Sequence, residues 1–236
     1  MKSLALALAV IAAPLASAGA ASISDDFDDN FTDTALWSVI NEGSGVTVAE
    51  TNQRVEVTLA ADAAGAFFGG YRTNAVFSGD VDAEVSFSLL DWPGTSGVRV
   101  GLSLVTGWLP TSFWNMERVS GGAIEAFDEV YLTDYNTSIG VLVPTADLTG
   151  RLRIARQGNT LSAWYLQGGE WSLLRSDTVA SGDVSVAFAA WSDDQYFGNQ
   201  PVRVAFDNAT VVPLPGTALF LMTGLGAVLV RARSRK

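Results

Sequence analysis

The chain has 236 residues, and its 25 Asp and Glu against 14 Lys and Arg give a formal net charge of −11 at pH 7. It contains no histidine and no cysteine, which excludes Ser-His-Asp and Cys-His catalysis, nearly every catalytic zinc arrangement and a disulfide framework. A chain this acidic repels nucleic acid and anionic lipid surfaces and attracts divalent cations.

The first twenty residues have the three-part order of a secretory signal peptide. Lys2 supplies the positive charge, residues 4–13 form an apolar run, and residues 14–20 are mostly small. This order predicts export and removal of the segment by signal peptidase. Ala18 and Ala20 both satisfy the A-x-A rule, so two cleavage positions stay open.

Between residues 21 and 211 the apolar side chains recur with a period of two, as in half-buried strands. The clearest case is residues 81–89, where Val, Ala, Phe and Leu alternate with Asp, Glu and Ser. Turn-forming residues separate such segments, for example at 157–159 and 181–183. We find no convincing helix in this region. About a dozen short strands predict one all-β domain, built as a two-sheet sandwich or a barrel.

The order of these segments resembles the concanavalin A-like lectin and glucanase family. The resemblance is carried by an acidic-aromatic opening (DDFDDNFTDTALWSV), a long hairpin at 77–105, a three-strand run at 150–174 and a closing VRVAFDNATVV. It implies a two-sheet antiparallel jelly-roll sandwich over residues 21–211, in which the first and last strands lie side by side.

Many members of this family place a structural calcium ion where those two strands meet, and the resemblance implies Asp28 and Asp207 as its ligands. Carboxylate and backbone carbonyl oxygens are the ligands that calcium prefers. The stretch DDFDDN lacks the Gly and the twelfth-position Glu of an EF-hand loop. Charge that protects edge strands from aggregation is the alternative explanation for these acidic residues.

Glucanases of this family use paired carboxylates on one strand, and the best candidate here is IEAFDEVY, with Glu125, Asp128 and Glu129. Glu125 and Asp128 would face opposite sides of a regular strand. Glu125 and Glu129 would lie about 13 Å apart along the strand, whereas a retaining pair needs carboxyl groups about 5–5.5 Å apart. We therefore expect no catalytic activity and keep a glycoside hydrolase as the disfavoured alternative.

Aromatic residues beside Gly, Pro, Ser, Asp or Asn predict a carbohydrate-binding surface on loops and strand ends. Rings there can stack on sugar faces while polar neighbours meet the hydroxyl groups. The candidate residues are Trp108, Trp114, Asn115, Trp191, Asp193 and Tyr196. The alternative is that the rings fill the core of a purely structural envelope or matrix protein without glycan affinity.

The C-terminus has three zones. Residues 217–230 carry no charge, and residues 231–236 contain four basic side chains. As a helix, 14 uncharged residues span roughly 21 Å, short of a hydrocarbon core of about 30 Å. A transmembrane helix would therefore have to begin near the preceding motif, and the basic end fits a cytoplasmic stop. That motif consists of Val212, Pro213, Leu214 and Pro215.

This order over residues 212–236 resembles the PEP-CTERM class of bacterial sorting signals in its VPLPA-type variant, with Gly216 where that variant usually has Ala. The resemblance implies handling by an exosortase, a membrane enzyme that recognises the motif and passes the protein to the outer surface. Loss of both signals would leave 9 basic and 25 acidic residues, a net charge of −16.

Together these features predict an exported, non-catalytic jelly-roll protein of the bacterial envelope or extracellular matrix. Its expected partners are signal peptidase, an exosortase-type enzyme and an exopolysaccharide or other glycan, with no nucleic acid. The single C-terminal hydrophobic helix would anchor it in the membrane at least until it is processed. Apart from one structural calcium ion, no cofactor is expected.

Overall fold

The computed structural model describes residues 21–61, 63, 65–93, 97–107, 113–120, 129–136, 138–192 and 201–214. Within these ranges the chain forms strands, turns and loops but no helix, so none of the described residues belongs to a helix that could cross a membrane. The predicted signal peptide and the predicted C-terminal helix lie outside the described residues. The all-β prediction is confirmed for the described part.

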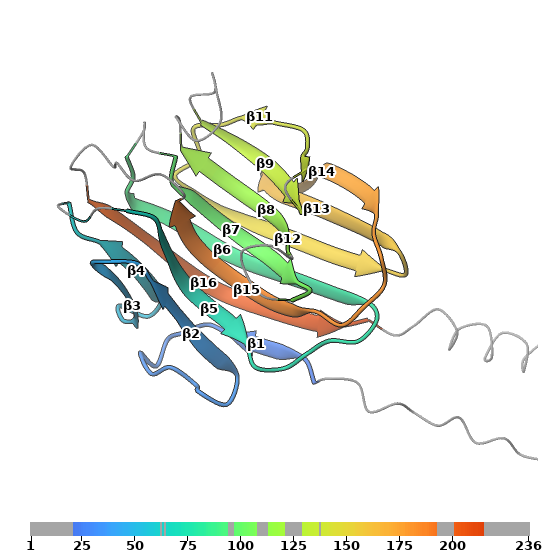
Figure 1. Ribbon diagram of the computed structural model, residues 1–236, viewed down its shortest axis with the longest axis horizontal. Helices are drawn as coiled ribbons and strands as arrows, with labels where there is room; N and C mark the ends of the chain where they lie inside the picture. Colours follow the sequence, from blue (N-terminus) through green and yellow to red (C-terminus); the bar gives the residue numbers. More distant parts are fainter. Residues whose placement is uncertain are drawn as a thin grey trace, which may run out of the picture.

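Sheet A contains eight strands in the order β14-β13-β12-β6-β16-β4-β3, with β1 beside β16 (Figure 1). All neighbouring strands in it are antiparallel. Strands far apart in the sequence, such as β6 and β16, are therefore neighbours in space. The strand bounds are β1 Ile23–Asp25, β3 Val46–Glu50, β4 Val55–Leu59, β6 Val81–Asp91, β12 Thr149–Gln157, β13 Thr160–Gln167, β14 Glu170–Thr178 and β16 Val202–Pro213.

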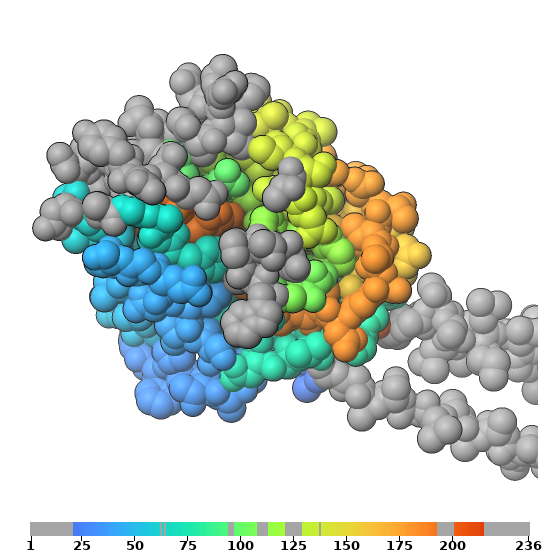
Figure 2. All heavy atoms as spheres, in the orientation of Figure 1, coloured from blue at the N-terminus to red at the C-terminus, as the bar shows by residue number. Residues whose placement is uncertain are grey.

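Sheet B also contains eight antiparallel strands, in the order β10-β9-β8-β7-β15-β5-β2 with β11 beside β9. In Figure 2 the blue segment of β2 and β3 and the yellow-to-orange segment of β9 to β14 lie on opposite sides of the molecule, because these strands form opposite sheet edges. The bounds are β2 Trp37–Glu42, β5 Phe67–Thr73, β7 Arg99–Val105, β8 Phe113–Ser120, β9 Glu129–Tyr135, β10 Ser138–Ile139, β11 Val143–Pro144 and β15 Ser185–Ser192.

The core lies between the two sheets and follows from alternation along each strand. In β6, Val81, Val85 and Phe87 are buried, while Asp82 and Glu84 between them stay partly exposed. The period of two predicted for residues 81–89 is thus confirmed. Each fully buried Val or Phe side chain stabilises the fold by roughly 1.5–3 kcal/mol relative to an exposed one.

The first and last strands lie side by side, as the family resemblance implied. Ile23 pairs with Val211 and Asp25 with Ala209. The first half of β16 pairs with β4, and β6 occupies the other edge of β16 along its length. β4 and β1 therefore follow one another along one edge of β16, and both ends of the described chain lie at one end of the sandwich.

We call the end that holds Ile23 and Pro213 the terminal end, and the end where β15 finishes at Ser192 and β16 begins at Val202 the loop end. β16 is 12 residues long. At a rise of about 3.3 Å per residue it spans roughly 36 Å. The length of β16 therefore gives the distance between the terminal end and the loop end.

The proline motif begins inside the fold. Val212 pairs with Asp82 and Pro213 with Val81, and the backbone N–H of Leu214 donates to the carbonyl of Asp80 at 2.9 Å. A proline that ends a strand costs little, because no further ladder bond is needed there. Pro215 lies outside the described residues, and the sorting role of the motif stays a prediction.

Candidate functional site

The face of sheet B that points away from sheet A carries a group of polar side chains. In β8, Trp114 and Met116 pack in the core, so alternation turns Asn115 and Glu117 to the outward face. Asn115 is paired with Asp134 of β9 in the ladder. Polar groups from two strands are therefore on the same outward face.

Arg99 of β7 joins this group. Its Nη1 donates to Glu117 Oε2 at 3.2 Å and lies 4.0 Å from Asp134 Oδ2. Asn115 Nδ2 donates to Glu117 Oε1 at 3.0 Å. The Glu117 side chain has no exposed surface, and the Arg99 side chain keeps 12 % of its surface exposed. We call Arg99, Asn115, Glu117 and Asp134 the polar cluster.

Burial gives the polar cluster unusual electrostatics. Loss of solvent raises the pKa of Glu117 to about 7, although Arg99 and the hydrogen bond from Asn115 act in the opposite direction. The nearby Asp134 carboxylate raises that pKa further. Glu117 can therefore be an acceptor or a donor near neutral pH. Asn115 Oδ1 is buried and accepts no hydrogen bond, so a bound hydroxyl group would satisfy it.

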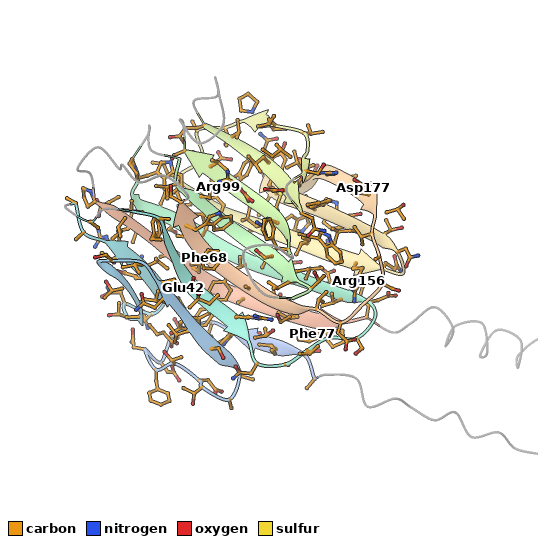
Figure 3. All side chains as sticks on the ribbon, in the orientation of Figure 1. Glu42, Phe68, Phe77, Arg99, Arg156 and Asp177 are labelled. Atoms are coloured by element: carbon orange, nitrogen blue, oxygen red, sulfur yellow. The ribbon has the colours of Figure 1, made fainter. Side chains whose placement is uncertain are left out.

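Two aromatic rings lie beside the polar cluster on the same face. Trp191 of β15 and Phe68 of β5 are directly paired, and their ring centroids are 5.6 Å apart with 31° between the planes. Trp191 is also paired with Arg99 on its other side. Trp191 is 7 % exposed and Phe68 is partly exposed. The rings and Arg99 lie toward the loop end, as the labels of Phe68 and Arg99 show in Figure 3.

The arrangement of these side chains is better suited to binding a ligand that carries hydroxyl groups than to catalysing hydrolysis. Between them, the carboxylates and Asn115 Oδ1 offer acceptors for hydroxyl donors, and Phe68 offers a ring for apolar contact. The outward positions of β8 are Phe113, Asn115, Glu117 and Val119, so this strand provides one carboxylate and no pair. The second carboxylate, Asp134, comes from β9.

The structure brings two of the predicted sugar-binding residues together, because Asn115 and Trp191 both lie on this outward face. Trp114 does not lie in a loop or on the surface, where the sequence predicted it. It is the second residue of β8 and faces inward, opposite Tyr135, where its ring fills the core. The remaining candidates, Trp108, Asp193 and Tyr196, lie outside the described residues.

Of the three carboxylates weighed for hydrolysis, the structure describes only Glu129, which lies on the other face of sheet B. Glu129 opens β9 opposite Ser120 and forms an ion pair with Arg118, which is buried on the inward side of β8. Glu125 and Asp128 lie outside the described residues. Sequence reasoning missed Glu117. The signal that could have found it is the adjacent Glu117-Arg118 pair inside β8, between the apolar residues Met116 and Val119.

The predicted calcium ligands lie near each other. Asp28 is exposed in the turn after β1, and Asp207 precedes the irregularity in β16. Partial burial raises the pKa of Asp207, and the carboxylates of Asp28 and Asp26 raise it further. Among the described residues, however, no group of three or more acidic side chains is placed to hold a metal ion. A calcium ion there would need backbone carbonyl groups, and it stays a prediction.

Comparison with known proteins gives a likeness in structure alone. No protein-family model matches the chain, and no curated protein matches it in sequence. Solved structures do match. A prokaryotic β-1,3-1,4-glucanase (lichenase) from a mouse hindgut metagenome has a TM-score of 0.58 at 14 % identity, with 82 % of this chain and 99 % of that chain covered. The chain has a jelly-roll fold.

Two other solved structures support the same assignment. A β-glucanase of Bacillus licheniformis has a TM-score of 0.58 at 13 % identity, covering 83 % of this chain and 99 % of that one. A lectin from Bauhinia forficata in complex with GalNAc has a TM-score of 0.55 at 12 % identity, covering 82 % and 99 %. The fold is thus shared with both lectins and glycoside hydrolases, and at these identities the likeness is one of fold.

Proposed function

We propose that this chain binds a glycan on the outward face of sheet B, at the Trp191–Phe68 ring pair and the polar cluster beside it. The observation that carries the proposal is the meeting of an aromatic pair with buried hydrogen-bonding groups on one sheet face, which is the usual composition of a sugar site. The jelly-roll neighbours, which include a lectin in complex with GalNAc, support the same assignment.

The ligand would reach this face through its partly exposed members. Phe68 and Arg99 would make the first contacts, the ring by stacking on the apolar face of a sugar and the guanidinium by donating to its oxygens. After local movement of the side chains that cover it, a hydroxyl group of the sugar would satisfy Asn115 Oδ1, which is buried and lacks a donor. Because unmade buried hydrogen bonds cost about 1–3 kcal/mol, this contact favours a ligand rich in hydroxyl groups.

The binding test uses the full chain against mixed-linkage β-1,3-1,4-glucan and a panel of galactose and GalNAc conjugates. We expect saturable binding to at least one of them, and a loss of about tenfold or more in Phe68→Ala, which corresponds to about 1.4 kcal/mol. Phe31→Ala is the matched control, because Phe31 is 72 % exposed and lies outside the site. No binding by the parent chain, or equal loss in both variants, would contradict the proposal.

A hydrolase is the second candidate, and one observation favours it. Glu117 has a pKa raised to about 7, and Asp134 lies near it through their shared neighbour Arg99. A carboxyl group with a raised pKa is suited to act as a general acid. Release of reducing sugar from the β-glucan, abolished in Glu117→Gln, would establish activity. We propose a non-catalytic role because β8 provides a single outward carboxylate.

We also infer export and surface sorting from the two terminal sequence signals. Signal peptidase would leave Gly19 or Ala21 as the first residue, according to which A-x-A site is used. An exosortase would act at Val212–Pro215 and deliver the domain to the outer surface or matrix. Mass spectrometry of the chain recovered from the cell surface tests this inference, and a chain found only inside the cell with residues 1–20 intact would contradict it.

A further inference from the structure

The ring pair and Arg99 lie at the opposite end of the sandwich from the chain termini, and the rest of the polar cluster extends from Arg99 along the face of sheet B toward its middle. Trp191 is the next-to-last residue of β15, and its partners Arg99 and Phe68 lie at the first residue of β7 and the second residue of β5. All three are at the loop end. Ile23 and Val211 are paired at the terminal end. Figure 3 shows the same separation, with Phe68 and Arg99 toward one side and Phe77 and Arg156 toward the other.

The separation between the two ends is about the length of one long strand. β16 connects the two ends directly, from Val202 to Pro213, and its length of roughly 36 Å is the distance between them. Its hydrogen-bonded partners β6 and β4 hold it along one side each. The distance is therefore set by a rigid strand in the middle of a sheet.

The point at which the chain leaves the terminal end is also fixed. Leu214 donates its backbone N–H to the Asp80 carbonyl at 2.9 Å, and the buried Arg156 donates through Nε to the neighbouring Gly79 carbonyl at 3.0 Å. Only Pro215 and Gly216 separate Leu214 from the uncharged run at 217–230. The run therefore begins within about 11 Å of Leu214, at the terminal end, because three steps of at most about 3.6 Å separate Leu214 from Thr217.

We propose that the chain binds glycan in trans. When the C-terminal segment is held on a surface, the ring pair and Arg99 lie at the end of the domain farthest from that surface, on the lateral face of sheet B, within reach of a polymer outside it. The domain then links the surface that holds its tail to a second, separate glycan. This inference rests on the proposed function, since it assigns an orientation and a kind of partner to the same site.

Immobilisation through a single cysteine tests the orientation, because the parent chain contains no cysteine. Ser181 and Ser44 are both exposed and serve as a matched pair of attachment points. Ser181 precedes Val184 by three residues, and Val184 bridges to Phe77 at the terminal end. Ser44 lies in the turn between β2 and β3 at the loop end, next to Glu42, whose ladder partner is Phe68. Neither serine belongs to the site.

Full-length Ser181→Cys and Ser44→Cys are coupled at equal density to a maleimide surface and exposed to polymeric β-1,3-1,4-glucan. We expect the chain held through position 181 to bind as the free chain does, and the chain held through position 44 to bind at least about tenfold less polymer. Equal binding in both orientations, or loss through position 181, would overturn the inference. If the free chain and both variants bind no glycan in solution, the proposed function itself fails, which separates the two outcomes.

Discussion

The six-membered ring of Trp191 lies directly over Gly101. A Cβ atom at position 101 would stand 2.5 Å from Cη2 and 2.8 Å from Cζ3 of that ring, closer than real side chains approach. The ring therefore occupies the space that any other residue at 101 would need. The position of Trp191 on the outward face depends on the absence of a side chain in the neighbouring strand.

Gly101→Ala should accordingly push Trp191 away from the sheet. Overpacking of this kind destabilises a protein by about 1–3 kcal/mol, and the displaced ring should also lose its contact with Phe68. Urea denaturation and the intrinsic tryptophan fluorescence measure the two effects. Gly182→Ala is the control, because nothing lies within 4 Å of a Cβ there. A Gly101→Ala protein with unchanged stability and fluorescence would contradict the packing.

Glu117 should make stability depend on pH. Because burial raises the pKa of Glu117 from its model-compound value of 4.5 to about 7, the folded state binds a proton more tightly than the unfolded state. Its favourable contribution is complete below about pH 4.5 and is lost as pH rises through about 7, by an amount on the order of 3 kcal/mol. The free energy of unfolding should therefore fall between about pH 5 and 8 in the parent chain.

Glu117→Gln isolates this effect. Glu50 also has a pKa raised to about 7 by burial and by hydrogen bonding to Asp29, so the parent and the variant share that part of the pH dependence. The variant should lose less stability over the same range, as measured by urea denaturation at several pH values. Identical slopes for the two proteins would show that Glu117 titrates as it does in the unfolded chain.

Removal of calcium should destabilise the chain if Asp28 and Asp207 hold an ion. An ion bound only to the folded state at 100 times its dissociation constant stabilises by about 2.7 kcal/mol. EDTA should then lower the melting temperature, and added calcium but not sodium should restore it. Asp207→Asn should abolish the response. A melting curve that is the same with EDTA and with calcium would contradict a calcium site at Asp28 and Asp207.

A second group of side chains, on the outer face of sheet A, should serve stability. Arg153 contacts two rings, with its guanidinium carbon 4.9 Å from the centroid of Trp164 and 5.8 Å from that of Trp171. Its Nε also donates to Asp82 Oδ1 at 2.9 Å. These contacts connect β12 to β13, β14 and β6. Cation–π contacts at partly exposed sites contribute about 0.5–1 kcal/mol each.

Arg153→Ala should therefore cost about 1–2 kcal/mol in the free energy of unfolding, measured by urea denaturation, without changing glycan binding. Arg203→Ala serves as the matched control, because Arg203 forms one ion pair with Asp91 and its side chain is 44 % exposed. Exposed ion pairs contribute about 0–1 kcal/mol. An equal loss of unfolding free energy in the two variants would mean that the contacts of Arg153 with the two rings do not contribute to stability.

Trp114 and Trp191 show where prediction from sequence stops. Both stand near an end of a strand and beside a small or polar residue, so their surroundings in sequence predicted the same role. Trp191 reached the outward face and Trp114 the core. A shift of one residue in the start of a strand exchanges its two faces, and the turn-forming residues Gly107 and Pro110 before β8 do not specify the residue at which that strand starts.

The polar cluster could not be predicted for a different reason. Arg99, Glu117 and Asp134 are spread over residues 99 to 134, and no local spacing connects them. They meet because β7, β8 and β9 pair in one register. The acidic stretch around Glu125 was a stronger signal in sequence, yet Glu129 from that stretch faces the opposite side and is paired with Arg118.

The sequence by itself determined the class of fold, the alternation that makes the core and the chemistry that is excluded. These properties are local or compositional: a period of two buries one face of a strand wherever that strand lies, and a chain without histidine or cysteine lacks their chemistry in every fold. The tertiary structure alone decided which outward side chains meet and how far the site lies from the termini. Both depend on strand order and register between segments distant in the chain, which hydrophobic periodicity does not specify.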